Sequence, residues 1–393
     1  MSPPLLMIPG PIEVSPAVVE AFSVPPPSHL APDLMDAFGR SLERMRAVWC
    51  ADAAAQPFII PGSGSLAMEV AATNLVDPGD RVLQVSSGYF GERMATMLRR
   101  RGAEVEVVSA PALGGVADLD AVASVLRGGG FRALFATHVD TSTGARVDAE
   151  ALSALAREHG CLSVFDGVCS TAAERFEMHD WGADVYLTGS QKAIGLPAGL
   201  ALLVFSPRAM KARSALKTPP PMSLDVEVWR PIMEAYEARS PSYFATPATN
   251  LIMALDVSLG ELLDDRLEGD RGMAARFARH HKVASAMRAA WRALDLTLLP
   301  VPGVEANTMS AIRLPAGVDA SLPARVKEHG VVIAGGLHPD IKKTYFRVGH
   351  MGDVVRRHDA LLRTVDAVAA GLADAGHRGD AAAARAAASA GLN

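Results

Sequence analysis

Lys192 ends the stretch Val185-Tyr-Leu-Thr-Gly-Ser-Gln-Lys192, in which an apolar, strand-like run gives way to a short polar turn. A lysine at the exit of such a turn lies near the carboxyl edge of a parallel sheet, where ligands bind in open α/β folds. An amine at that place can act as a nucleophile toward a carbonyl carbon. Most loop lysines are simply solvated, so this interpretation depends on companion residues at the same edge.

Asp166 is the first companion, because it ends the apolar run Leu162-Ser-Val-Phe-Asp166. We expect its carboxyl group at the same edge of the sheet. Burial there raises the pKa of a carboxyl group unless a cation faces it, and a protonated pyridine nitrogen would be such a cation. The competing interpretation is that Asp166 only caps the next turn.

The second companion is the glycine-bearing turn Pro61-Gly-Ser-Gly-Ser65, which lies between a predicted strand and a predicted helix. Such a turn directs free backbone N–H groups and the positive end of a helix toward an anion. It lacks the lysine of a Walker A loop and the full GxGxxG of a dinucleotide site, which disfavours nucleoside triphosphates and NAD. The three features together indicate a phosphorylated, pyridine-type aldehyde that Lys192 holds as a Schiff base.

Alternating strand and helix patterns from about residue 31 to 260 would position these groups. This alternation predicts an α/β fold, in which a large cofactor-binding domain contains a mostly parallel seven-stranded sheet flanked by helices. The predicted strands are Phe58–Ile60, Arg81–Val85, Glu104–Val108, Ala133–Ala136, Leu162–Phe165, Val185–Thr188 and Ala201–Phe205. The predicted helices between them are Ser65–Leu75, Gly91–Arg101, Leu119–Leu126 and Asp148–His159.

The remaining segments predict smaller units. Residues 1–30 are rich in proline and predict an N-terminal arm, whereas the six prolines within 218–247 predict a non-helical crossover between domains. After a helical stretch at about 248–295, further strand and helix patterns, including one strand over 331–334, predict a small C-terminal α+β domain at 261–378. The tail at 379–393 is mostly alanine, and we expect it to fray.

The composition restricts the classes of function. The chain has 393 residues, of which 49% are hydrophobic and 21% charged, so it has ample material for a globular core. A net charge of −5 without a basic block disfavours nucleic acid and anionic membranes as partners. No stretch is long and apolar enough to span a bilayer and no signal peptide is evident, so we expect a soluble, cytoplasmic protein. The three cysteines form no CxxC pair, so we expect neither a disulfide framework nor a metal site.

The chain resembles the class V aminotransferases, a family of fold-type I pyridoxal-phosphate enzymes, and within them the alanine–glyoxylate and serine–glyoxylate (serine–pyruvate) group. The resemblance implies pyridoxal 5'-phosphate (PLP) as the cofactor. It also implies transamination between a small L-amino acid, alanine or serine, and a 2-oxo acid, glyoxylate or pyruvate. The motifs that carry the resemblance are Pro9-Gly-Pro-Ile, Gly62-Ser-Gly-Ser, Gly88-Tyr-Phe-Gly-Glu-Arg, Thr137-His-Val-Asp-Thr-Ser-Thr-Gly, Phe165-Asp-Gly-Val, Gly189-Ser-Gln-Lys, Thr246-Pro-Ala-Thr-Asn and Arg347-Val-Gly-His-Met-Gly.

The resemblance implies a role for individual residues. Lys192 matches the family's Schiff-base lysine, which also moves the α-proton, and Asp166 matches the acid that holds the pyridinium proton. Arg347 matches the arginine that binds the substrate α-carboxylate, and Gly10 would bring backbone close to a small substrate. The implied cofactor contacts are Phe90 and Val168 on the two ring faces, Thr141 or Ser142 near the 3-oxygen, Ser63, Gly64, Ser65 and Gln191 at the phosphate, and Tyr243 and Thr246 at the partner's phosphate.

Tyr243 and Thr246 match residues that the family sends across a dimer interface, so the resemblance implies a homodimer with shared active sites. Arg239, or an arginine of the partner, could accept a longer acidic substrate. Gly167 and His350 lie close enough to the core motifs to alter substrate choice.

Several alternatives stay open. A specialised aminotransferase of the aminoethylphosphonate or ureidoglycine type, and a PLP-binding protein without turnover, are both compatible with these motifs. A cysteine desulfurase is disfavoured because it needs a mobile cysteine in the C-terminal half. All three cysteines here, Cys50, Cys161 and Cys169, lie before residue 170.

Overall fold

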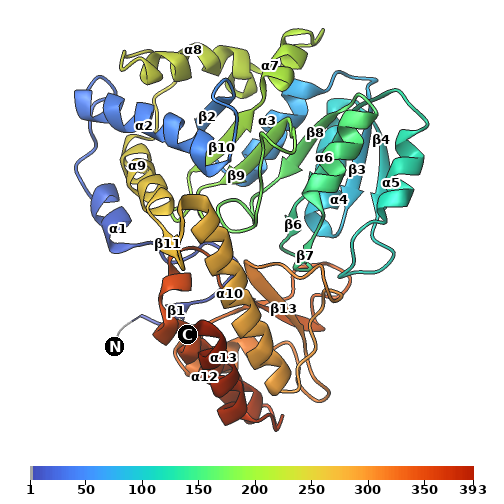
Figure 1. Cartoon of the computed structure of the whole chain (residues 1–393), viewed down its shortest axis with the longest axis vertical. Coiled ribbons are helices and arrows are strands. Elements are labelled where there is room, and N and C mark those ends of the chain that lie inside the picture. The colour runs from blue at the N-terminus through green and yellow to red at the C-terminus, as the bar shows by residue number, and fades with distance from the viewer. Residues whose placement is uncertain (1–2) are drawn as a thin grey trace.

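The computed structural model describes residues 3–393, and a seven-stranded sheet forms its centre (Figure 1). The strand order is β2-β10-β9-β8-β5-β3-β4, and only β10 runs antiparallel to its neighbours. The predicted mostly parallel, seven-stranded sheet is therefore confirmed. The strands are β2 (Gln56–Pro61), β3 (Arg81–Ser86), β4 (Glu104–Ser109), β5 (Phe131–Thr137), β8 (Leu162–Asp166), β9 (Val185–Gly189) and β10 (Leu200–Phe205).

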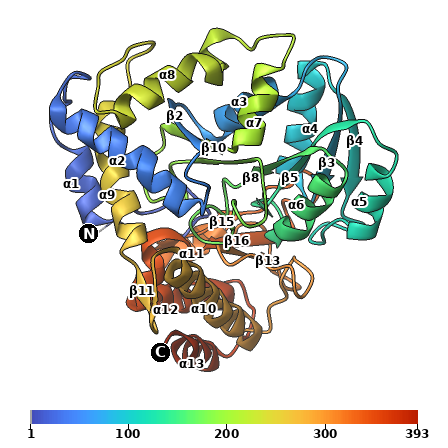
Figure 2. The same ribbon diagram turned by 45° about the horizontal axis from the view of Figure 1, so that its top comes forward.

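Helices cover both faces of the sheet, as Figures 1 and 2 show. Because the crossovers keep the strands parallel, the carboxyl ends of β2, β3, β5, β8 and β9 meet at one edge. The four predicted helices between the strands are confirmed. The helices that follow individual strands are α3 (Gly64–Leu75), α4 (Tyr89–Arg101), α5 (Leu119–Leu126), α6 (Ala149–Glu158) and α7 (Pro207–Ser214).

A group of helices packs beside β2, and its core is continuous with that of the sheet. The N-terminal segment contributes to this group through α1, and it also places β1 parallel to β14 of the C-terminal part. The segment predicted as an arm thus contacts both parts of the molecule. The elements are β1 (Leu5–Leu6), α1 (Pro16–Phe22), α2 (Pro32–Val48), α8 (Val226–Glu237) and α9 (Thr249–Leu263).

The prediction that the prolines of 218–247 exclude a helix is wrong. A short 3₁₀ turn, η1 (Met222–Leu224), leads into α8, which contains Pro231 in its interior. Helix α8 buries Trp229, Met233 and Tyr236 against α2 and β2, and this packing outweighs the unfavourable helix propensity of proline.

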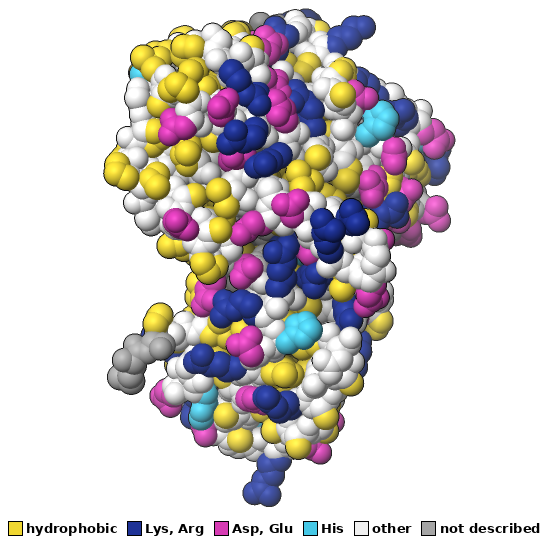
Figure 3. All heavy atoms as spheres, turned by 60° about the vertical axis from the view of Figure 1, so that its left-hand side comes forward, with side chains coloured by type: hydrophobic (Ala, Val, Ile, Leu, Met, Phe, Trp, Pro, Cys, Tyr) yellow, Lys and Arg dark blue, Asp and Glu magenta, His cyan; other side chains and the backbone are white. Residues whose placement is uncertain are grey.

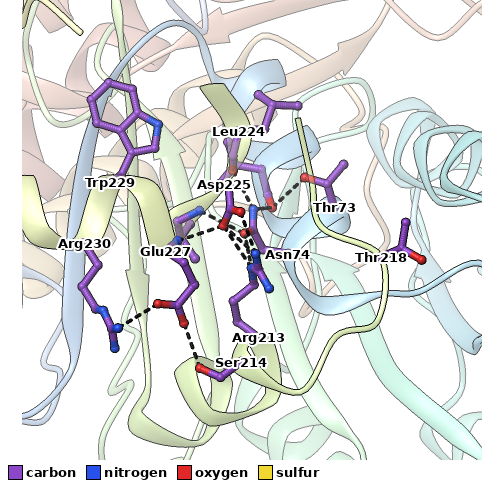
Figure 4. A network of polar contacts seen from close by, with 12 residues as sticks. Thr73, Asn74, Arg213, Ser214, Thr218, Leu224, Asp225, Glu227, Trp229 and Arg230 are labelled. Carbon is purple, nitrogen blue, oxygen red and sulfur yellow. Dashed lines mark hydrogen bonds and ion pairs between the residues drawn. The ribbon is translucent and has the colours of Figure 1, made fainter. Parts of the chain in front are cut away.

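A buried polar network holds the start of α8 against α3 and α7 (Figure 4). Arg213 of α7 forms an ion pair with Asp225 at 2.7 Å, and both side chains are largely buried. The Oδ1 atom of Asn74, near the end of α3, accepts hydrogen bonds from Arg213 Nε at 2.9 Å and from the backbone N of Val226 at 3.0 Å. The network therefore fixes this segment relative to the helix that begins at the glycine-bearing turn.

The C-terminal part has its own core and a three-stranded antiparallel sheet, in the order β13-β16-β15. The single strand expected over 331–334 is instead two short strands, because β14 pairs with β1 whereas β15 pairs with β16. The expected domain limits at residues 30, 260 and 378 remain predictions. The elements of this part are β11 (Arg266–Leu267), β12 (Asp270–Arg271), α10 (Gly272–Ala293), β13 (Met309–Arg313), α11 (Leu322–Glu328), β14 (Val331–Val332), β15 (Ala334–Gly335), β16 (Tyr345–Gly349), η2 (Gly352–Arg356) and α12 (His358–Asp374). Two further short strands, β6 (Val139–Asp140) and β7 (Ala145–Arg146), lie between β5 and α6 and pair with each other.

The prediction that the alanine-rich tail frays is also wrong. Residues Ala381–Leu392 form helix α13, which packs against α10 and α12 and buries Ala384, Ala388 and Leu392. Asp380 caps this helix by accepting a hydrogen bond from Ala383 N at 2.9 Å. Alanine has the highest helix propensity, and its small side chain lets two helices approach closely.

Candidate active site

A pocket of about 220 Å³ lies where the carboxyl ends of the strands meet. Since a protein cavity of about 150 Å³ can bind benzene, this pocket has room for a small organic molecule. Nine of the predicted site residues line it, namely Ser63, Gly64, Ser65, Phe90, Thr141, Asp166, Val168, Gln191 and Lys192. Five lining residues were not predicted, namely Met68, Arg93, Thr137, Val139 and Cys169.

Lys192 is buried, and its amine faces the N-terminal segment. The Nζ atom donates a hydrogen bond to the backbone oxygen of Pro9. Burial lowers the pKa of Lys192, and the nearby positive charge of Arg347 lowers it further. A larger share of the amine is therefore uncharged at neutral pH, which is the form that attacks a carbonyl carbon.

Gly10 lies directly against the side chain of Lys192. A Cβ atom at this position would lie 2.4 Å from Cδ of the lysine, and the backbone φ of +97° also favours glycine. The structure thus brings Gly10 against Lys192, whereas the expected approach of its backbone to a substrate remains a prediction. The backbone at Pro9 and Gly10 forms one side of the space around Nζ.

Asp166 ends β8 and is 3% exposed. Its Oδ1 atom accepts a hydrogen bond from the backbone N of Val168 at 2.9 Å, and no hydrogen bond joins Oδ2 to any residue within 3–393. Burial raises the pKa of Asp166 to about 7, and the neighbouring carboxyl group of Asp140 raises it as well. A cation in the pocket beside Oδ2 would restore the charged form.

The glycine-bearing turn opens α3 on one side of the pocket. Ser63 caps this helix by accepting a hydrogen bond from Leu66 N at 3.3 Å. Two polar atoms of the pocket lining, Gln191 Oε1 and Thr137 Oγ1, are buried without a hydrogen-bond partner among the described residues. Buried polar atoms without partners are rare in native proteins, so these two fit a ligand that carries hydrogen-bonding groups.

Asp140 holds the start of α4 and thereby positions Phe90. Its Oδ2 atom accepts a hydrogen bond from the backbone N of Phe90 at 2.9 Å. Ser142 Oγ accepts a hydrogen bond from Tyr89 N at 3.0 Å. Ser142 is fully buried and does not line the pocket. Of the two hydroxyl residues that the sequence left open, only Thr141 lines the pocket. Asp140 was not predicted, although it lies within a motif that the sequence singled out.

Arg347 lies on β16 beside this pocket and does not line it. Its Nε atom donates a hydrogen bond to Gly335 O at 2.8 Å, and Nη1 donates to Thr141 O at 3.2 Å. These contacts fix the plane of the guanidinium group. Because Thr141 lines the pocket together with Lys192, the contact with Thr141 O places the guanidinium group at the pocket's edge.

Four residues that the sequence analysis singled out lie outside this pocket. Tyr243 is 63% exposed, and its hydroxyl lies 3.4 Å from Thr246 Oγ1 on the segment that follows α8, outside the pocket of its own chain. His350 is fully buried, with Nε2 at 3.0 Å from Ser310 Oγ, and does not line the pocket. Arg239 donates a hydrogen bond to Glu43 at 2.7 Å, which holds it away from the pocket.

Within residues 3–393, no group of three or more His, Cys, Asp or Glu side chains has an arrangement that could hold a metal ion. Within the same range, no helix is long and apolar enough to cross a membrane.

Comparison with known proteins identifies the family. The family described as aminotransferase class-V matches residues 28–357 of the chain. The chain belongs to the class-V aminotransferases. Enzymes of this family depend on PLP, so the protein is a PLP-dependent aminotransferase. The orphaned polar atoms of Gln191 and Thr137, the unpaired Oδ2 of Asp166 and the amine of Lys192 all fit this cofactor.

Two curated relatives and one solved structure document the similarity. The chain is 40% identical to alanine–glyoxylate aminotransferase 1 of Saccharomyces cerevisiae over 88% of the chain and 91% of the relative. It is 35% identical to L-aspartate–glyoxylate aminotransferase of Paracoccus denitrificans over 89% of the chain and 86% of the relative. The crystal structure of pyridoxamine–pyruvate aminotransferase from Mesorhizobium loti superposes with a TM-score of 0.91 at 26% identity, covering 100% of the chain and 97% of that structure.

Proposed function

We propose that this class-V aminotransferase transfers the amino group of a small L-amino acid, alanine or serine, to glyoxylate or pyruvate. The observation that carries the proposal is one pocket that combines the buried amine of Lys192 with the buried carboxyl group of Asp166, beside the guanidinium group of Arg347. The names of the yeast and Paracoccus relatives both contain glyoxylate, which supports this 2-oxo acid as the acceptor.

We propose that Lys192 binds PLP through a Schiff base and later moves the proton at the substrate Cα atom. When bound, PLP supplies a positively charged ring that withdraws electrons from that carbon. Asp166 would keep the ring nitrogen protonated, because a buried carboxylate is stabilised by a facing cation. Burial keeps a share of Lys192 uncharged, so its Nζ atom can accept the proton and return it.

The remaining cofactor contacts are proposed from the pocket lining. Phe90 and Val168 would enclose the ring, and Thr141 would reach the 3-oxygen in preference to Ser142, whose hydroxyl is occupied by Tyr89 N. The phosphate would bind at the start of α3, where backbone N–H groups and the helix dipole favour an anion. The residues proposed for that contact are Ser63, Gly64, Ser65 and Gln191.

The preference for a small donor follows from the charges around the pocket. Arg347 offers one planar guanidinium group, which suits a single bidentate carboxylate. Arg239 is held by Glu43, so it does not offer a second carboxylate site to the pocket of its own chain. Gly10 lies against Lys192 without a side chain of its own, and its backbone would contact a small substrate there.

The test is the absorbance spectrum of the PLP-loaded protein with alanine, serine and aspartate, followed by glyoxylate. We expect the visible Schiff-base band to disappear with alanine or serine and to return with glyoxylate. The Lys192→Ala variant, with folding checked by circular dichroism, should lack that band. A band that responds only to aspartate would contradict the small donor. A wild-type protein that forms no band with PLP would contradict the role of Lys192.

We propose further that the active enzyme is a homodimer in which each site uses Tyr243 and Thr246 of the partner. Both residues are exposed on their own chain, and the ring of Tyr243 lies 5.5 Å from that of His29, which precedes the exposed Leu30. Phe22 and Met222 are further exposed apolar residues. Figure 3 shows hydrophobic side chains on the larger, upper lobe of the molecule. Exposed apolar surface of this kind supports an interface with a second copy.

Subunit complementation tests the shared site. Lys192→Ala and Tyr243→Ala should each have low activity alone. In a mixed dimer one site carries both substitutions and the other carries neither, so mixing the variants should restore up to about half of the wild-type activity per dimer, because activity resides in independent sites. If Tyr243 acted within its own chain, mixing would restore nothing.

We also propose a cytoplasmic location. Cys50, Cys161 and Cys169 are all unpaired, which suits a reducing compartment. Cell fractionation tests this proposal, and recovery of the protein from an oxidising compartment would contradict it.

A further inference from the structure

The phosphate side of the pocket contains a charged residue, Arg93, that ends one of the sequence motifs but to which the motifs assigned no role. Arg93 of α4 lines the pocket, with Nη1 3.3 Å from Ser65 Oγ and Nη2 3.1 Å from Tyr89 Oη. We propose that Arg93 supplies the fixed positive charge that balances the cofactor phosphate. This inference rests on the proposed function, because it assumes that PLP occupies the pocket with its phosphate at the start of α3.

A fixed charge is needed because the other proposed phosphate contacts are neutral. A phosphate monoester carries a charge of about −1.5 to −2 at pH 7. Ser63, Ser65 and Gln191 offer hydrogen bonds without charge, and the start of α3 contributes only about +0.5 of an elementary charge. These contacts leave more than one negative charge of the phosphate unbalanced, so a full positive charge is needed on this side of the pocket.

Arg93 and Lys192 are the cationic residues of the pocket lining among the described residues. The nitrogen of Lys192 is committed to the cofactor aldehyde, and its pKa is lowered, so it offers no dependable charge to the phosphate. A guanidinium group stays protonated at any pH that the protein tolerates. Arg93 is therefore the lining residue that can balance the negative charge of the phosphate.

Arg93 also contacts Phe90, the residue proposed to stack on the cofactor ring. Its Cζ atom lies 5.1 Å from the ring centroid of Phe90 and 5.0 Å from that of Tyr89, within range of cation–π attraction. The spacing of Phe90 and Arg93 on α4 brings the two side chains onto one face of the helix. One guanidinium group thus contacts both Ser65 and the aromatic ring that would stack on the cofactor.

Arg93 differs from Arg347 in its surroundings. Arg347 belongs to β16 of the C-terminal part and is bonded to Gly335 O and Thr141 O. Arg93 belongs to α4, the helix after β3, and donates a hydrogen bond to the hydroxyl group of Ser65 in the glycine-bearing turn. The two arginines therefore serve different anions, the phosphate for Arg93 and the substrate carboxylate for Arg347.

The decisive experiment compares PLP with pyridoxal, which has the same aldehyde and ring but no phosphate. Dissociation constants for both are measured from the Schiff-base absorbance in wild type, Arg93→Gln, Arg93→Lys and Arg100→Gln. Arg100 is an exposed arginine of the same helix and serves as the matched control. We expect Arg93→Gln to weaken PLP about tenfold to a hundredfold, the usual range for a hydrogen-bonded charge, with pyridoxal changed less than about threefold. Arg93→Lys should recover part of the loss, and Arg100→Gln should equal wild type.

Three outcomes would overturn the proposal. Equal PLP affinity in wild type and Arg93→Gln would mean that the charge has no role. Equal losses for PLP and pyridoxal would mean that Arg93 only supports Phe90. Unchanged PLP affinity with a raised KM for the amino acid would assign Arg93 to the substrate. A wild-type protein that binds neither aldehyde contradicts the proposed function itself, which is a separate result.

A measurement on the wild-type protein covers the case in which Arg93→Gln does not fold. Phenylglyoxal modifies accessible arginines, and mass spectrometry identifies each modified site. We expect PLP and inorganic phosphate to protect Arg93, and pyridoxal to protect it much less, while Arg100 stays reactive throughout. Protection by pyridoxal equal to that by PLP, or no protection by either phosphate, would contradict the proposal.

Discussion

The backbone of Gly167 lies against the ring of Tyr186, and a Cβ atom at this glycine would lie 2.4 Å from Cζ of the tyrosine. The Tyr186 hydroxyl lies 2.9 Å from His138 Nδ1 and 2.8 Å from Ser170 Oγ, so the ring is held from three sides in the core behind the pocket. Gly167 directly follows Asp166, and its missing side chain points to Tyr186. The sequence suggested an effect of Gly167 on substrate choice, whereas this geometry indicates a packing role.

A serine at position 167 should destabilise the protein without altering its substrate preference. Overpacking of a filled core costs about 1–3 kcal/mol, so Gly167→Ser should lower the free energy of unfolding by about that amount. Because the clash is with the tyrosine ring, Gly167→Ser combined with Tyr186→Leu should cost less than the sum of the two single changes. Denaturant unfolding of the four proteins measures this coupling. A changed ratio of kcat/KM for alanine and serine, at full stability, would contradict the packing role.

An alanine at position 10 should displace the side chain of Lys192. Its Cβ atom would lie 2.4 Å from Lys192 Cδ, and the φ of +97° disfavours any residue except glycine. A misplacement of about 1 Å can reduce a rate by about a hundredfold, so we expect Gly10→Ala to reduce kcat by one to two orders of magnitude. Pro9→Ala is the matched control, because Pro9 contacts the lysine only through its backbone oxygen. Equal losses in both variants would mean that the effect comes from the segment as a whole.

Much of the fold could be predicted because hydrophobic periodicity is a local signal. The seven strands and the helices between them are contiguous patterns in the chain, and their parallel arrangement follows from strict alternation. The errors arose where packing overrides local propensity. Pro231 is tolerated within α8 because that helix buries an apolar face, and the alanine-rich tail is ordered because Ala384 and Ala388 pack against neighbouring helices.

The site was predictable where a motif carries its own chemistry. Lys192, Asp166 and the turn before α3 lie at strand ends that the topology brings to one edge. Arg93 ends a motif that the sequence singled out, but its role was missed because an arginine on the first turns of a helix is usually solvated, and Ser65 lies 28 positions away in the chain. Asp140 was missed because its hydrogen bonds reach residues about fifty positions away in the chain.

Loss of the Arg213–Asp225 ion pair should be costly. Removing one member of a buried pair leaves an uncompensated charge and costs about 3–5 kcal/mol, so Arg213→Met should lower stability by that order. The partly exposed pair Arg230–Glu227, at 2.8 Å and with side chains 42% and 24% exposed, is the control, and Arg230→Ala should cost less than about 1 kcal/mol. Thermal or denaturant unfolding measures both variants. Similar losses of stability in the two variants would show that burial does not determine how much an ion pair contributes to stability.

The cofactor-free protein should lose stability with rising pH because of Asp166. Its pKa in the folded protein is about 7, above the ordinary value of 3.8 for an aspartate, so the folded state binds this proton more tightly than the unfolded state. The resulting stabilisation is fully present below about pH 4 and is lost as pH rises through 7. A difference of about three pKa units corresponds to about 4 kcal/mol between these limits. The Asp166→Asn variant, which cannot ionise, should lack this part of the pH dependence.

The measurement is the free energy of unfolding of cofactor-free wild type and Asp166→Asn between pH 5 and 8, because subtraction removes the contribution of other groups such as Asp140. We expect the wild type to lose stability relative to the variant as pH rises. PLP should reverse the trend in the wild type alone, since a protonated ring nitrogen beside the carboxylate favours its charged form. Parallel curves for the two proteins would mean that Asp166 is already ionised without a cation, and the proposed pairing with the ring nitrogen would lose its electrostatic basis.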